Sequence, residues 1–102
     1  MENEQIKKKI LADYKTLLGL KYDSPDLVKE KLRIIGERIG QLDRSTSEGN
    51  DVLDEAHRLI NSALSTDYLA FAEALTEEDK EEALAQVKHK AAEACQRLQI
   101  HA

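Results

Sequence analysis

The residues with the clearest potential for chemistry form one short segment, Asp54-Glu55-Ala56-His57. In helicases this order of residues works beside a P-loop that holds nucleotide phosphates, and the chain has no Gly-rich segment ending in Gly-Lys-Ser/Thr. On a helix, Asp54 and His57 lie about one turn apart, so they could share a metal ion or a hydrogen bond. A di-iron bundle, however, needs two Glu-x-x-His repeats and two further Glu residues, and this chain holds one imperfect match. We therefore expect no metal or nucleotide site here.

The single cysteine and the remaining histidines do not have the spacing of a nucleophilic pair. Cys95 lies six residues from both His89 and His101, a separation that does not make neighbours on a helix. A Cys–His pair would also need an orienting third group and a pocket. A lone cysteine is more typical of a small core residue, and it favours a reducing, cytoplasmic environment. We predict no enzyme activity, no cofactor and no small-molecule substrate.

Charge is unevenly distributed along the 102 residues, whose net charge is −5. Residues 1–21 carry a net charge of +2, whereas residues 67–82 hold seven acids and one lysine, a net charge of −6. The acidic stretch disfavours contact with a phosphate backbone, so nucleic acid is not an expected partner. Four lysines near the N-terminus could bind nucleic acid, namely Lys7, Lys8, Lys9 and Lys15, and the first three could also dock on anionic lipid. A solvated helix face is the favoured interpretation. No apolar segment follows them as in a secretory signal, and no apolar run is long enough to span a bilayer.

Apolar residues at helical spacing predict two helices in the first half of the chain. The first covers about residues 2–18, and Gly19 suits the left-handed position that ends many helices. The second begins after Ser24, a potential N-cap followed by Pro25, and runs to about Arg44. Gly36 and Gly40 lie four residues apart within it, a pair that favours close packing of another helix.

The second half of the chain predicts two more helices after a small, polar loop at 45–50. The third helix starts at about Asp51, and Ser65-Thr66-Asp67 could end it. We favour its continuation to about residue 75, with a kink, because residues 68–75 contain neither Gly nor Pro. Thr76 is a potential N-cap with acids behind it, and the last helix is expected to reach about Leu98. Short loops between helices of this length favour antiparallel neighbours. We therefore predict one domain, 1–102, that is all-α and forms an antiparallel up-down-up-down four-helix bundle.

Two segments are similar to a known family of small helical proteins. They are Leu75-Thr76-Glu77-Glu78-Asp79 with Leu84 and Val87 behind it, and Val52-Leu53-Asp54-Glu55-Ala56-His57-Arg58-Leu59-Ile60-Asn61. With the expected four helices, they resemble the enterocin A immunity family, whose members protect bacteriocin producers from their own toxin. The resemblance covers most of the chain in layout and specific residues in about 50–88. Many family members are basic and carry an extended C-terminal tail, whereas this chain is acidic and stops soon after its last helix.

The resemblance implies a cytoplasmic protein, either free or peripheral at the inner membrane face, that acts by binding. Its expected partner is a membrane receptor of the sugar permease type, with or without bacteriocin, and a monomer is expected rather than a dimer. Discrimination between toxins is expected in the C-terminal half, where the candidate contacts are Lys88, His89, Lys90, Arg97 and Ile100. The alternative is a generic helical interaction or regulatory module, which could be dimeric.

Overall fold

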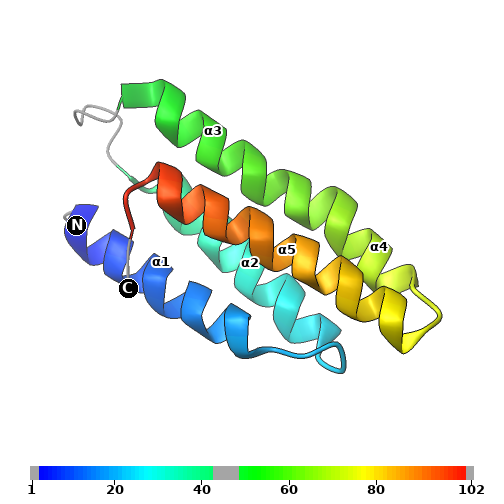
Figure 1. Cartoon of the computed structure of the whole chain (residues 1–102). Coiled ribbons are helices and arrows are strands. Elements are labelled where there is room, and N and C mark those ends of the chain that lie inside the picture. The colour runs from blue at the N-terminus through cyan, green and yellow to red at the C-terminus, as the bar shows by residue number, and fades with distance from the viewer. Residues whose placement is uncertain (1–2, 43–48, 101–102) are drawn as a thin grey trace.

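A computed structural model describes residues 3–42 and 49–100 of the chain, and all its regular elements in these ranges are helical (Figure 1). The elements are α1 (Asn3–Gly19), α2 (Pro25–Gly40), α3 (Gly49–Ser62), the π-helical turn η1 (Ala63–Asp67), α4 (Tyr68–Glu73) and α5 (Glu77–Arg97). The predicted all-α fold is confirmed. The predicted polar loop at 45–50 falls mostly outside the described residues, except that Gly49 and Asn50 already belong to α3.

The helices form an elongated bundle of 45 × 22 × 18 Å in which α3, η1 and α4 follow one another as a single long rod. Figure 1 shows successive long helices running in opposite directions, with the two termini at one end of the molecule. Each long helix packs against its neighbours in sequence, and α5 also packs against α1, which closes the bundle. The molecule therefore has two ends. One holds the termini, and the other holds the α1–α2 and α4–α5 connections.

The α1–α2 connection forms where predicted, but two of its details differ from the prediction. Gly19 is the last residue of α1 and does not adopt a left-handed conformation, so the prediction for it is wrong. Ser24 precedes α2 as expected, yet its hydroxyl makes no capping hydrogen bond and lies 3.3 Å from Asp23 Oδ1 instead. Pro25 at the first helical position still starts α2, because its φ angle suits a helix and its missing N–H needs no partner there.

Helix α2 ends at Gly40, four residues before the predicted Arg44, which lies outside the described residues. The N–H groups of Gln41 and Leu42 bond three residues back, to Arg38 and Ile39, so the last turn tightens after Gly40. The two glycines of α2 differ in role. Gly36 is buried, and a methyl group in its place would lie 3.3 Å from Cγ2 of Ile60 on α3. Only Gly36 therefore permits a close helix approach, since Gly40 has open space around it.

The third predicted helix continues through Ser65-Thr66-Asp67, as favoured from the sequence, by way of η1. A π-helical turn inserts a residue into the helical register, and such insertions are a common cause of kinks in helices. The rod continues as α4 to Glu73, after which Ala74 adopts an extended conformation. Thr76 then caps α5 as predicted, because its Oγ1 accepts a hydrogen bond of 3.1 Å from the backbone N–H of Asp79.

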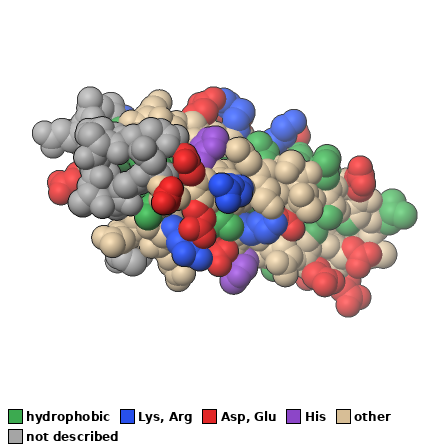
Figure 2. All heavy atoms as spheres, turned by 90° about the horizontal axis from the view of Figure 1, so that it is seen from above, with side chains coloured by type: hydrophobic (Ala, Val, Ile, Leu, Met, Phe, Trp, Pro, Cys, Tyr) green, Lys and Arg blue, Asp and Glu red, His purple; other side chains and the backbone are tan. Residues whose placement is uncertain are grey.

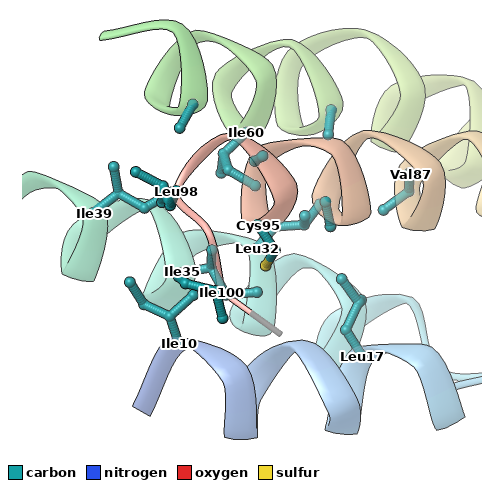
Figure 3. Packing of buried hydrophobic residues seen from close by; sticks show 14 of the residues in the cluster. Ile10, Leu17, Leu32, Ile35, Ile39, Ile60, Val87, Cys95, Leu98 and Ile100 are labelled. Atoms are coloured by element: carbon teal, nitrogen blue, oxygen red, sulfur yellow. The ribbon is translucent and has the colours of Figure 1, made fainter. Parts of the chain in front are cut away.

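One apolar core runs through the bundle, and within the described ranges it contains no buried polar or charged side chain (Figure 3). The largest side chains that are fully enclosed come from all four rods of the bundle: Phe71, Ile10, Leu17, Leu32, Ile35, Ile60, Leu98, Val28 and Val87. Because such side chains are almost completely removed from water, each contributes about 1.5–3 kcal/mol of transfer free energy. The predicted helical stripes are therefore used to join the helices to one another.

Candidate functional site

Lys88, the first of the predicted contact residues, is half-buried, and its side chain makes hydrogen bonds within the bundle. Its Nζ donates to the carbonyl oxygens of Leu18, at 3.0 Å, and Leu20, at 2.6 Å. These carbonyls lie at and just beyond the C-terminal end of α1, where helical carbonyls lack partners within the helix and carry a partial negative charge. The charge of Lys88 is therefore occupied in joining α5 to α1.

Lys90 is engaged in a similar way on the other side of α5. Its Nζ donates to Ser62 Oγ at 2.7 Å and lies 2.7 Å from Asp67 Oδ2. Ser62 immediately precedes η1, and Asp67 is its last residue. The ammonium group of Lys90 therefore holds both ends of the π-helical turn against α5. The side chain of Asp67 is only 16% exposed, which makes this ion pair less screened than a surface pair.

His89 and Arg97 are the predicted contact residues that remain at the surface. His89 is exposed, and Arg97 Nη2 lies 3.2 Å from Glu55 Oε1 in a pair whose side chains are both about half exposed. Such a pair contributes little to stability, so the guanidinium group can exchange Glu55 for another carboxylate at small cost. Both residues lie on α5 eight positions apart, and they therefore share one broad face of the helix.

Ile100 was predicted to be an exposed or terminal contact, and this prediction is wrong because its side chain is only 7% exposed. The chain reverses at Gln99, which has a φ angle of 59°. The N–H of Ile100 bonds to the carbonyl of Cys95 at 2.9 Å, and that of Gln99 bonds to Gln96 at 3.0 Å. These two bonds define a Schellman motif, which turns the following apolar residue back onto the helix. Ile100 consequently joins the core in the region of Ile10 and Ile35 (Figure 3).

The residues considered for catalysis lie apart from one another. His57 Nδ1 lies 3.2 Å from the side-chain amide of Asn61, one turn along α3. Cys95 is buried, and desolvation raises the pKa of its thiol to about 11, which keeps it protonated at neutral pH. His101 lies outside the described residues. In the ranges 3–42 and 49–100, no group of three or more His, Cys, Asp or Glu side chains could hold a metal ion.

The most exposed apolar side chains of the second half of the chain lie at the end of the bundle that holds the α4–α5 connection. Leu75 is 96% exposed in this connection, and Leu69 is 51% exposed on α4. Figure 2 shows acidic side chains gathered around a hydrophobic tip at this end of the molecule. Sequence reasoning missed this surface, although its signal was present. Residues 68–75 are almost entirely apolar, whereas the sequence prediction of a continuous helix there rests only on the absence of Gly and Pro.

Two open grooves flank the N-terminal half of α5 at the same end. The larger, of about 660 Å³, lies between α5 and the α1–α2 connection, and its lining includes Tyr22, Leu84 and Lys88. The hydroxyl of Tyr22 donates a hydrogen bond to Glu77, and this carboxylate is the main cause of the raised pKa of Tyr22. The second groove, of about 400 Å³, lies between α4 and α5. Both are open depressions in the surface, so they suit a partner molecule that lies across the bundle.

Comparison with known proteins gives no match to a family model, to a curated protein or to a solved structure. Within the described ranges, no helix is both long enough and apolar enough to cross a bilayer.

Proposed function

We propose that this chain is a bacteriocin immunity protein that acts without catalysis. In this proposal it binds, from the cytoplasmic side, to a membrane receptor of the sugar permease type that a bacteriocin has engaged. The observation that carries the proposal is the four-helix architecture, which is the fold implied by the resemblance of residues 50–88 to the enterocin A immunity family. The segment Leu75–Asp79 supports it further, because it forms the capped start of α5.

Binding through the outer surface is consistent with the way in which the helices use their apolar stripes. The apolar residues of these stripes pack against one another in the common core, so a partner can contact only the outer surface of the bundle. In the C-terminal half, His89 and Arg97 are accessible for this purpose, whereas Lys88 and Lys90 are held by hydrogen bonds within the bundle. We therefore assign receptor contact to His89 and Arg97 before the two lysines.

Expression in a toxin-sensitive strain tests the proposal. Cells that express the chain should survive at least one class II bacteriocin at concentrations that kill cells carrying the empty vector. The double variant His89→Ala/Arg97→Ala should reduce this protection, while Lys8→Ala/Lys15→Ala, which changes exposed residues of α1, should retain it. Unchanged killing by every bacteriocin of the class, with the chain present as soluble protein, would contradict the proposal.

A helical interaction module of another kind is the second candidate, and the exposed leucines of α4 and its connection favour it. A dimer through the Gly36/Gly40 face is disfavoured, because Gly36 already faces Ile60 inside the bundle. Size-exclusion chromatography with light scattering distinguishes the candidates. A monomer at micromolar concentration agrees with the immunity proposal, whereas a tight dimer supports the second candidate.

A further inference from the structure

The segment 68–75 has the composition of a buried helix but the exposure of a surface helix. Seven of its eight residues are apolar, and only Phe71 is buried. Tyr68 is half-buried and meets Phe71 edge to face, with ring centroids 6.2 Å apart. Leu69, Ala72 and Leu75 are exposed, as is Ala70. A helix that is apolar all round is normally covered all round, so this face has the character of an interface.

The groove between α4 and α5 lies beside this face, and small side chains make up much of its lining, whereas Leu69 and Leu75 are not part of it. Ala70 and Ala74 line it from α4 and its C-terminal end, and Ala83 lines it from α5. Small side chains allow the backbone of another helix to approach closely. Amphipathic helices commonly bind by laying their apolar face into such a groove between two helices.

Carboxylates form the rim of the groove. Glu73, Asp79 and Glu82 line it together with Asp67. Lys90 neutralises Asp67, but in the described part of the chain no cationic side chain pairs with Glu73, Asp79 or Glu82. The stretch 67–82 as a whole carries a net charge of −6. This charge selects the occupant, because an anionic membrane or a nucleic acid is repelled. A second copy meeting the same face would bring like charges together.

We propose that the α4–α5 groove docks a basic amphipathic helix of a partner protein. Leucine or similar side chains of that helix cover Leu69 and Leu75, and its lysines or arginines pair with Glu73, Asp79 and Glu82. The inference stands on this surface alone and holds whether or not the chain confers immunity. The proposal specifies the chemistry of a partner, a basic amphipathic helix, which neither the fold nor the family resemblance identifies.

Fluorescence anisotropy with a synthetic peptide tests the proposal on the full chain. The probe is a labelled helical peptide of about 18 residues, which is about 27 Å long at 1.5 Å per residue, with leucines on one face and lysines on the other. Leu69→Ser/Leu75→Ser should weaken its binding about tenfold, since the proposed helix covers both leucines beside the groove. The control Leu18→Ser/Leu27→Ser changes the two other exposed leucines of the described residues, at 44% and 51%, and should bind as the wild type does.

Charge variants test the rim separately. Glu73→Gln/Glu82→Gln should weaken binding about fivefold and flatten its salt dependence, whereas Glu4→Gln/Asp26→Asn, with the same change in net charge, should not. A control peptide with glutamates in place of the lysines should not bind. Circular dichroism checks that each variant stays folded, as expected for exposed positions. Absence of binding at about 1 mM peptide, or equal losses in the target and control variants, would overturn the proposal.

Discussion

The ammonium group of Lys88 on α5 lies 2.6 Å from the carbonyl oxygen of Leu20, just beyond the end of α1. Sixty-eight residues separate the two in the sequence, so this contact joins the last helix of the bundle to the first. The Tyr22–Glu77 hydrogen bond joins the same two regions a little closer to the connections. Together they hold the α1–α2 connection against the N-terminal half of α5, where the larger groove lies.

Replacing Lys88 with Met should lower the free energy of unfolding by about 1–2 kcal/mol, because two carbonyl oxygens lose a charged donor. The methionine keeps most of the aliphatic stem, so the loss reports on the ammonium group. Lys29→Met on the exposed side of α2 is the matched control and should change stability by less than about 0.5 kcal/mol. Urea unfolding followed by circular dichroism measures both. Equal stability of the two variants would show that the contact is dispensable.

The two glycines of α2 should respond oppositely to alanine. Gly40→Ala meets open space and should stabilise the protein by about 0.5 kcal/mol through its higher helix propensity. Gly36→Ala places a methyl group 3.3 Å from Ile60 Cγ2, so the Ile60 side chain must shift to admit it, and overpacking costs about 1–3 kcal/mol. Since both changes gain helix propensity, thermal and urea unfolding should rank Gly36→Ala below Gly40→Ala by the overpacking cost of about 1–3 kcal/mol. The reverse order would mean that α2 and α3 lie further apart than described.

Gln99 is the one described non-glycine residue with a positive φ angle, at 59°. A side chain in this conformation is strained, and glycine removes the strain while adding freedom to the unfolded chain. Gln99→Gly should therefore stabilise the protein by about 0.5 kcal/mol. Gln99→Val should destabilise it, since a β-branched residue disfavours the left-handed region. Differential scanning calorimetry measures both shifts, and a loss of stability in Gln99→Gly would argue against the Schellman motif.

The buried thiol of Cys95 should make stability fall at alkaline pH. Its pKa rises on folding from the ordinary 9.0 to about 11, so between these values the unfolded thiol ionises while the folded thiol keeps its proton. Stability is thus fully present below pH 9 and decreases as pH rises towards 11, by at most about 1.4 kcal/mol per pH unit. Cys95→Ala should lack this component, which separates it from tyrosine titration. Parallel pH profiles of wild type and Cys95→Ala would contradict the burial of the thiol.

The helices and most of the core were predictable from the sequence because apolar spacing and local start signals act over only a few residues. The stripe of α2, the cap at Thr76 and the continuation past Ser65 all follow from such signals. The Gly36 contact was predictable as a possibility, but only the packing against Ile60 distinguishes it from Gly40.

The surface was harder to predict because exposure depends on which helices become neighbours. Lys88 and Lys90 read as free surface charges, yet their partners are 68 and 23 residues away in the chain. Ile100 was expected to be exposed because it lies near the end of the sequence. Its burial depends on a chain reversal at Gln99, where the glycine that usually marks such a reversal is absent. Composition alone could not show which side of α4 is exposed. Apolar residues on nearly every side of a helix predict burial, but they do not say whether this chain or a partner covers each side.

The most direct test of the proposed function is whether the chain binds to membranes only when toxin and receptor are both present. Purified chain is mixed with membrane vesicles that contain or lack the sugar permease, with and without the bacteriocin against which expression protects, and the vesicles are sedimented. The account predicts that the chain sediments with permease-containing vesicles after toxin is added, and that His89→Ala/Arg97→Ala weakens this binding. A chain that remains in the supernatant under all four conditions would contradict it.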